Sequence, residues 1–202
     1  FKVKWLTKDE LEKLGLKAYA AIESKSGAVM DVYKLANALL EYCTDKGLKI
    51  YDRTEIEEIK YKDDKVIAKT KTGFSIEVAD VVHCTGYEST ETLKEDIVDL
   101  KSTFALASEA FEKIPKAFEK RIYWNTDSPY LYFRSTDDGR IVMGGGDREF
   151  KNAARRDALL PKKEKELVKS FNKCFPDIPF VMDHSWAGTF GETKDGLPYF
   201  GK

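Results

Sequence analysis

The end of the chain, residues 184–201, limits the fold most, because it is rich in glycine and contains several aromatic residues. We expect a strand, a polar turn and a second short strand here. Trp186 and Phe190 lie an even number of residues apart, so they face the same side of an extended chain. Glycine at this density lets a backbone approach a flat ligand closely or turn where φ is positive. A glycine-rich hairpin that binds nothing explains the same residues, so both interpretations stay open.

Two helices are predicted in the first part of the chain. Thr7 and Glu10 have the spacing of a capping box, which predicts a short helix that ends at Gly15. Residues 31–46 carry apolar side chains at helical spacing and predict a helix with one buried face. Cys43 lies on that face, where the expected role is that of a small core side chain.

Short strands are predicted around and after these helices. A hairpin is expected where residues 66–72 and 74–78 meet across Gly73. Residues 79–86 form an apolar run, which predicts a strand buried on both faces as in a parallel sheet. His83 lies inside this run, so we expect a core histidine with satisfied hydrogen bonds rather than a catalytic one. Further strands are expected at residues 18–22, 48–50 and 56–61.

The second half of the chain predicts antiparallel strands and one long helix. Residues 99–107 have both helical and strand spacing, so their pattern alone is ambiguous. Residues 151–160 are polar and predict a loop. Pro161 suits the first position of a helix that Pro176 ends. Antiparallel strands are expected at residues 121–124, 130–134 and 140–143.

Composition excludes several classes of function. The formal net charge is -1 and no basic cluster is present, which argues against nucleic acid as the main partner. No apolar run approaches the length of a membrane span, and no signal peptide is evident, so we expect a cytoplasmic protein. The 3 cysteines are widely spaced, which indicates free buried thiols in a reducing compartment and no metal site.

No catalytic motif can be assembled from the residues alone. His83 and His184 have no serine or cysteine at the spacing of a hydrolytic triad. No G-x-G-x-x-G sequence follows a strand. The glycines at residues 144–146 end a predicted strand and lead to Asp147 rather than to a helix, so they are not a phosphate loop. These observations predict only a soluble α+β domain.

Five short segments are nevertheless spaced along nearly the whole chain. They are S-G-A-V-M-D at residues 26–31, G-L-K-I and T-E-I within 47–56, D-V-V-H-C-T-G at 80–86, P-Y-L-Y-F-R and D-G-R-I-V-M-G-G within 129–145, and W-A-G and D-G-L-P within 186–198. In this order they resemble the D-amino-acid oxidase and glycine oxidase group of FAD-dependent oxidoreductases. One such segment is weak support, but five in the right order are strong support.

The resemblance implies a fold with α/β and α+β features. Part of an FAD-binding Rossmann-like domain would be joined to an antiparallel β-sheet substrate domain with flanking helices. Residues 1–90 would belong to the FAD-binding domain, with an inserted helix and β-hairpin. Residues 91–190 would form the substrate domain, and residues 191–202 a return strand toward the FAD domain. The resemblance also favours a strand through Leu106 in the ambiguous segment.

The resemblance further implies FAD as cofactor and hydride transfer to flavin N5 from a substrate C–H next to nitrogen or oxygen. Tyr130 and Tyr132 alternate along a strand, so only one is expected to point at the ligand, and Tyr130 matches the family's substrate tyrosine. The residues implied for the substrate are Tyr130, Tyr132, Arg134 and Phe190. Those implied for the cofactor are Thr54, Glu55, Ile56, Cys84, Thr85, Gly86 and Gly188.

Phe190 departs from the family pattern, in which an arginine at this position binds the substrate carboxylate. Either another cation, for which Arg134 is a candidate, takes this role or the substrate is not a simple amino acid. The N-terminal glycine loop and the C-terminal flavin segment are also missing. We therefore expect an internal piece of a longer enzyme that alone binds FAD poorly and is inactive. Its partners would be a small-molecule substrate and the rest of the same polypeptide.

Two alternatives stay open. A non-catalytic β-rich binding or scaffold module derived from the same family is favoured by Phe190. A flavoprotein that resembles glycerol-3-phosphate dehydrogenase would need a basic phosphate pocket. Arg148, Arg155 and Arg156 are candidates for that pocket, although a solvated loop also explains them.

Overall fold

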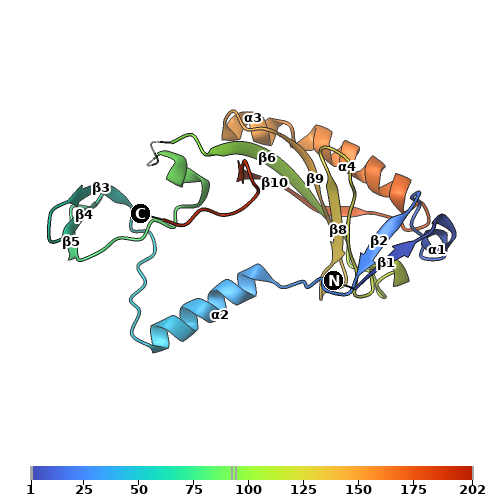
Figure 1. Cartoon of the computed structure of the whole chain (residues 1–202), viewed down its shortest axis with the longest axis horizontal. Coiled ribbons are helices and arrows are strands. Elements are labelled where there is room, and N and C mark those ends of the chain that lie inside the picture. Colours follow the sequence, from blue (N-terminus) through green and yellow to red (C-terminus); the bar gives the residue numbers. More distant parts are fainter. Residues whose placement is uncertain (1, 92, 94, 202) are drawn as a thin grey trace. The chain divides into compact units, whose positions relative to one another are not determined.

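A computed structural model describes residues 2–91, 93 and 95–201 (Figure 1). The chain divides into two compact units. The larger unit contains residues 1–28 and 86–202, and the smaller unit contains residues 29–85. Each unit is described by itself below.

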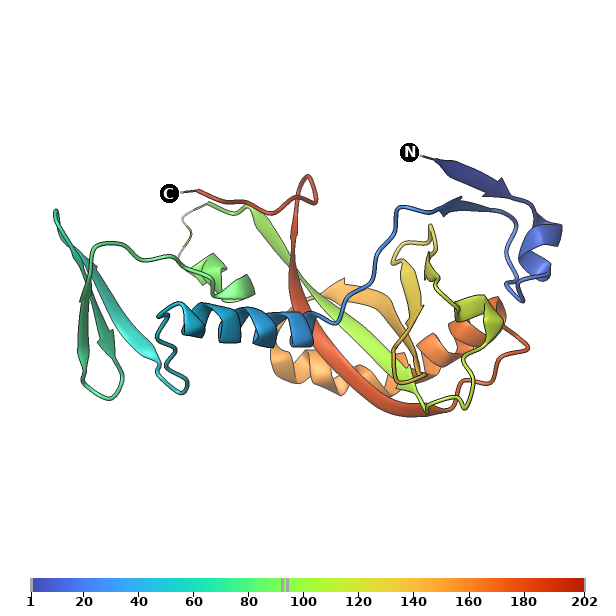
Figure 2. The same cartoon turned by 90° about the horizontal axis from the view of Figure 1, so that it is seen from below.

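The larger unit is built on a five-stranded antiparallel sheet with the order β10-β6-β9-β8-β7. The longest strands, β6 and β10, run side by side over most of their length (Figures 1 and 2). The ambiguous segment is therefore a strand, as the resemblance favoured. The bounds are β6 Val98–Ser108, β7 Ile122–Trp124, β8 Leu131–Ser135, β9 Ile141–Glu149 and β10 Met182–Thr193.

Two helices, α3 (Ala153–Ala158) and α4 (Leu160–Cys174), cover one side of this sheet, which we call the helix face (Figure 1). Phe171 of α4 is fully buried against it, and its ring centroid lies 4.8 Å from that of Phe180 and 5.2 Å from that of Phe175. Burial of one such ring stabilises a fold by roughly 1.5–3 kcal/mol. The apolar face predicted for this helix is thus confirmed.

A small two-stranded sheet precedes the five-stranded sheet in the larger unit. Its strands β1 (Val3–Leu6) and β2 (Ala21–Ser24) pair antiparallel, and α1 (Lys8–Glu12) lies between them in sequence. The predicted capping box is present, because the Thr7 backbone N–H donates to Glu10 Oε2 at 2.9 Å. Gly15 ends this segment with a φ of 75°, a conformation that favours glycine.

The smaller unit contains a helix and a three-stranded sheet in the order β3-β4-β5. The strands are β3 (Ile56–Tyr61), β4 (Val66–Thr70) and β5 (Ser75–Val78). The predicted hairpin across Gly73 is confirmed, since β4 and β5 pair antiparallel on either side of it. The helix α2 (Val32–Asp45) is capped by Asp31, whose Oδ1 accepts a hydrogen bond from the Lys34 backbone N–H at 3.0 Å.

The predicted burial of one face of α2 is wrong for this chain. No residue of α2 is buried, and Cys43 is only half-buried. Amphipathic spacing shows that a helix has an apolar face to be packed against another element. Within the described residues, no element buries the apolar face of α2. The exposed apolar side chains on α2 include Val32, Leu35, Leu39 and Leu40.

Three predicted strands are absent from the described residues. Residues 48–50 and 79–86 form no strand, and no second strand follows the turn after β10 up to residue 201. A strand requires a partner to satisfy its backbone groups, and these segments have none. His83 is exposed rather than buried, although its Nε2 is hydrogen-bonded to Tyr61 Oη at 2.8 Å. Cys84 is also exposed, so the expectation of buried thiols fails there. A 3-10 helix, η1 (Gly86–Glu91), follows.

Two further expectations for the second half need correction. The segment predicted as a polar loop contains α3, because Asn152 caps it by accepting from the Arg155 backbone N–H at 2.9 Å. The glycines at 144–146 do not end a strand but lie inside β9. The segment between β6 and β7 also holds a short 3-10 helix, η2 (Lys116–Phe118), that buries Phe118.

Candidate functional site

The five-stranded sheet has a second side, opposite the helix face, which we call the open face. Successive strand residues point to opposite sides, so register partners identify the face. One row of partners crosses all five strands on this side, and both of its tryptophans are exposed, Trp124 by 65% and Trp186 by 46%. The row is Trp124, Tyr132, Gly144, Ala105 and Trp186.

Tyr130 and Tyr132 lie together on the open face. Their ring centroids are 6.1 Å apart with an interplanar angle of 43°. The two side chains therefore share a side instead of alternating, as residues two apart along an extended chain do, and which of them faces a ligand stays a prediction. Burial raises the pKa of both phenols above the usual value. Both therefore stay neutral at physiological pH and can donate hydrogen bonds.

The glycines of β9 allow β8 to approach closely. A side chain on Gly144 would collide with the ring and hydroxyl of Tyr132. Gly145 has a φ of 133°, and a Cβ there would collide with the Tyr130 carbonyl oxygen. These two glycines are thus required by packing under the tyrosines.

The open face also carries a small polar cluster, which we define as Thr103, Asp147, Lys101 and Glu192. Lys101 Nζ lies 3.5 Å from Glu192 Oε2. The pKa of Asp147 is raised, mainly by burial, while Thr103 opposes the shift and Glu192 adds to it. The Oδ1 of Asp147 is shielded from solvent and accepts no hydrogen bond from the described residues. Sequence reasoning missed this residue, although its position directly after a glycine-rich strand segment was visible.

The other substrate residues implied by the resemblance belong to the same face. Arg134 is two residues beyond Tyr132 on β8, and its Nη1 donates to the Ser135 carbonyl at 3.2 Å. Trp186, Gly188 and Phe190 are each two residues apart along β10, so all three face the same side of the sheet. The structure thus brings the four candidate substrate residues and Gly188 onto one sheet face.

The remaining cofactor candidates belong mainly to the smaller unit. Thr54, Glu55 and Ile56 lie at the start of β3 and are exposed. Cys84 and Thr85 follow His83 and are also exposed, and Gly86 begins η1 in the larger unit. No hydrogen bond or ion pair links these two segments in the part of the chain that the structure describes. The roles of these residues toward a cofactor therefore stay predictions.

The open face suits a flat aromatic ligand such as a flavin ring. Small residues, Ala105 and Gly188, lie in the neighbouring strands β6 and β10 near its centre, whereas Gly144 is covered by the ring of Tyr132. The exposed side chains of Trp124 and Trp186 flank that centre. The residues present thus fit the ring system that the resemblance implies.

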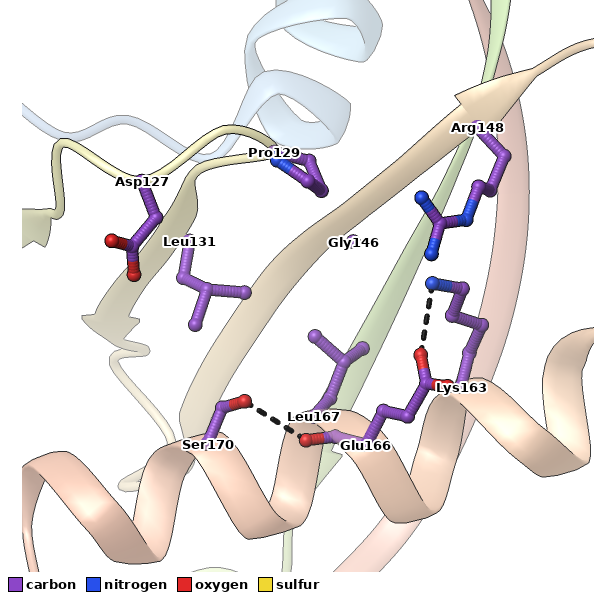
Figure 3. A pocket seen from close by; sticks show the side chains of 9 residues that line it. All are labelled: Asp127, Pro129, Leu131, Gly146, Arg148, Lys163, Glu166, Leu167 and Ser170. Carbon is purple, nitrogen blue, oxygen red and sulfur yellow. Dashed lines mark hydrogen bonds and ion pairs between the residues drawn. The ribbon is translucent and has the colours of Figure 1, made fainter.

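A separate pocket of about 200 Å³ lies between α4 and strands β8 and β9, on the helix face (Figure 3). Lys163 in this pocket is only 3% exposed, and its Nζ forms an ion pair with Glu166 Oε2 at 3.0 Å. Arg148 extends toward Lys163, whereas Asp127 lies at the opposite end. The pocket is lined by Asp127, Pro129, Leu131, Gly146, Arg148, Lys163, Glu166, Leu167 and Ser170.

The arginines considered for a phosphate pocket do not gather on the open face. Arg148 lines the pocket on the helix face. Arg156 is engaged by Asp157 at 2.8 Å and by the Thr189 hydroxyl at 2.9 Å. Arg155 belongs to the same short helix, α3, and is exposed.

The described residues offer neither a metal site nor a membrane-spanning helix. They contain no group of three or more His, Cys, Asp or Glu side chains placed to hold a metal ion. They also contain no helix with the length and apolar character needed to cross a membrane.

Comparison with known proteins gives one family and several similar folds. The family model described as "FAD dependent oxidoreductase" matches residues 1–202. L-proline dehydrogenase from P. horikoshii shares 18% identity and a TM-score of 0.78, over 99% of this chain and 55% of that one. Glycine oxidase from Geobacillus kaustophilus shares 20% identity and a TM-score of 0.76, over 100% of this chain and 54% of that one. Glycine oxidase from Bacillus cereus shares 19% identity and a TM-score of 0.78, over 100% and 56%.

The structures superpose over nearly the whole chain although the sequence identities are low. This superposition establishes the fold class. The mixed fold predicted from the sequence, with its antiparallel sheet and flanking helices, is confirmed. The chain spans about half the length of these solved structures. A search of curated protein sequences finds no match.

Proposed function

Because the chain belongs to the FAD-dependent oxidoreductase family, we propose that the complete gene product oxidises a small molecule at a C–H bond next to an amine, or next to a hydroxyl. The resemblance drawn from the sequence motifs is confirmed at the level of the family. The observation that carries the proposal is the family match over residues 1–202. FAD supplies the hydride acceptor, and the protein supplies binding, orientation and shielding.

The open face is the proposed substrate site. Tyr130 and Tyr132 would orient the substrate through their neutral hydroxyl groups. Trp186 and Phe190 present apolar surface that would exclude water above the reacting carbon. The shared face of these four side chains supports this assignment.

The reaction is proposed to be of the D-amino-acid oxidase type, with one difference in substrate recognition. A phenyl ring at position 190 cannot bind a carboxylate, whereas a guanidinium can do so through two hydrogen bonds. Arg134 on the same face would take that role for an amino-acid substrate. If no cation on this face takes that role, the substrate is not a simple amino acid. Similar folds include both amine-oxidising enzymes and a glycerol-3-phosphate dehydrogenase, so the fold itself leaves the substrate open.

The adenine side of FAD is proposed to contact Thr54, Glu55 and Ile56 on one side and Cys84, Thr85 and Gly86 on the other. We further propose that the 202-residue chain alone binds FAD poorly and is inactive, since the glycine loop that holds a pyrophosphate is not in its sequence. Its partners would be other parts of the same polypeptide, in the cytoplasm.

The competing proposal is a β-rich binding or scaffold module without catalysis. The replacement of the family's arginine by Phe190 favours it, because this change removes a substrate contact. The two proposals differ in whether the complete gene product carries a redox-active flavin.

The first experiment is a visible absorbance spectrum of the complete gene product, followed by the same spectrum of the 202-residue chain with excess FAD. Flavin bands in the former and not in the latter support the proposal. Anaerobic bleaching by a panel of amines, amino acids and hydroxy compounds then identifies the substrate class. A complete gene product without flavin bands contradicts the oxidoreductase proposal and leaves the binding module.

A further inference from the structure

Asp147 reaches the open face because of an irregularity in β9. The register between β6 and β9 shifts between Ser102 and Phe104. A Cβ added to Gly146 would point at Lys163 and Leu167, on the helix face, and Arg148 also lines the pocket there. Asp147, between those two residues, is therefore directed to the opposite side.

The charges around Asp147 leave it without a cation of its own. Two lysines are near enough to lower its pKa, Lys163 and Lys101. Each of them is paired with another carboxylate, Lys163 with Glu166 at 3.0 Å and Lys101 with Glu192 at 3.5 Å. No ion pair joins Asp147 to any cation within the described residues, and its Oδ1 accepts no hydrogen bond.

An unpaired carboxylate beside aromatic rings is a suitable site for an organic cation. Asp147 shares the open face with Tyr130 and Tyr132, whose ring centroids are 6.1 Å apart. Burial raises the pKa of each phenol, and the charge of Asp147 adds to that rise. Aromatic faces attract ammonium groups, and a carboxylate adds charge-assisted hydrogen bonds. The carboxyl torsion of aspartate is broad, so either oxygen can be presented to a ligand.

We propose that Asp147 binds the positively charged nitrogen of the substrate, with Tyr130 and Tyr132 as the wall beside it. This inference rests on the proposed function and deepens it, because it selects an amine over a hydroxyl compound. A hydroxyl substrate would bring no charge to pair with the Asp147 carboxylate. Asp147 is thus a specificity-determining residue that contacts the substrate.

The test measures binding to the complete gene product by isothermal titration calorimetry. The probes are benzylammonium and its uncharged isostere benzyl alcohol. Asp147→Asn removes the charge with little change of shape. Glu149→Gln is the matched control, since Glu149 lies two residues further along β9 and already pairs with Lys151 at 2.9 Å.

We expect Asp147→Asn to weaken benzylammonium binding by about tenfold, the scale of one charge-assisted hydrogen bond. Benzyl alcohol binding should change little, and Glu149→Gln should leave both probes unaffected. No benzylammonium binding to the wild-type protein, or equal binding to Asp147→Asn, overturns the inference.

The flavin spectrum of the same samples separates this inference from the proposed function. Flavin bands together with unchanged binding by Asp147→Asn overturn only the role of Asp147. Missing flavin bands contradict the oxidoreductase proposal, while calorimetry still decides whether Asp147 binds an ammonium group.

Discussion

The ring of Tyr132 lies directly against the backbone of Gly144, its register partner on β9, and leaves no room for a side chain. The contact holds the phenol on the open face next to Tyr130. It explains why a glycine is needed in the middle of a strand, where glycine otherwise weakens the structure.

Gly144→Ala should therefore displace Tyr132. Overpacking of this kind costs roughly 1–3 kcal/mol of unfolding free energy. Urea unfolding of the complete gene product measures the cost, and benzylammonium binding reports the displaced ring. Gly188→Ala is the control for stability, because a Cβ there meets only Thr103 Cγ2 at 3.6 Å. Equal stability of the two variants would show that Tyr132 moves aside freely.

Phe171 is the centre of the core between α4 and the sheet. Its ring is fully buried and lies within 6.0 Å of the Phe118 ring and 5.9 Å of the Phe133 ring, measured between centroids. Phe171→Ala should lower the unfolding free energy by about 3–5 kcal/mol through lost burial and a cavity. Tyr19, which is 95% exposed, gives the control variant Tyr19→Ala. A loss below about 1 kcal/mol at Phe171 would mean that the helix is not packed as described.

Parts of this architecture follow directly from sequence. Leu167 and Phe171 are four residues apart, which is helical spacing, and Pro161 marks the helix start. The helix α4 and its buried face were therefore predictable. The hairpin across Gly73 was equally clear, because alternating apolar residues flank a turn glycine. Such signals depend only on neighbours in the chain.

Features that depend on distant partners were not predictable. The spacing in α2 reveals an apolar face, but it cannot reveal which surface covers it. The apolar run that contains Val82 predicts burial, yet Val82 is 83% exposed because no strand pairs with this segment. Asp147 was missed because β9 contains an irregularity. From that point on, the residues of β9 face the side opposite to the one that regular alternation predicts.

The Lys163–Glu166 pair gives a test of the pocket on the helix face. Lys163 is buried with its Nζ 5.6 Å from the centroid of the Phe104 ring, whereas Glu166 is partly exposed. Glu166→Gln leaves the buried ammonium group of Lys163 without its carboxylate and should lower the unfolding free energy by about 1–3 kcal/mol. This loss is smaller than for a fully buried ion pair, because Glu166 is partly exposed. Lys163→Met removes the charge itself and keeps an unbranched apolar chain, so its cost should be within about 1 kcal/mol. Urea unfolding of both variants checks this order, and a larger loss for Lys163→Met would contradict it.

The stability contributed by Asp147 should depend on pH in the direction opposite to that of a paired carboxylate. Burial raises the pKa of Asp147 above the usual 3.8, so the folded protein binds this proton more tightly than the unfolded chain does. Stability from this group is then fully present below the unfolded pKa and is lost as pH rises through the folded pKa. Asp147→Asn should therefore gain stability relative to wild type on going from about pH 3.5 to about pH 7.

Asp138 provides the matched control for this pH dependence. The Thr136 hydroxyl, followed by Arg140, lowers the pKa of Asp138 below 3.8. Its contribution is present above the unfolded pKa and is lost as pH falls, so Asp138→Asn should lose stability relative to wild type over the same rise in pH. Urea unfolding at both pH values measures the two variants side by side. A shift of the same sign for both variants would contradict the assigned environment of Asp147, in which burial and the Glu192 charge raise the pKa.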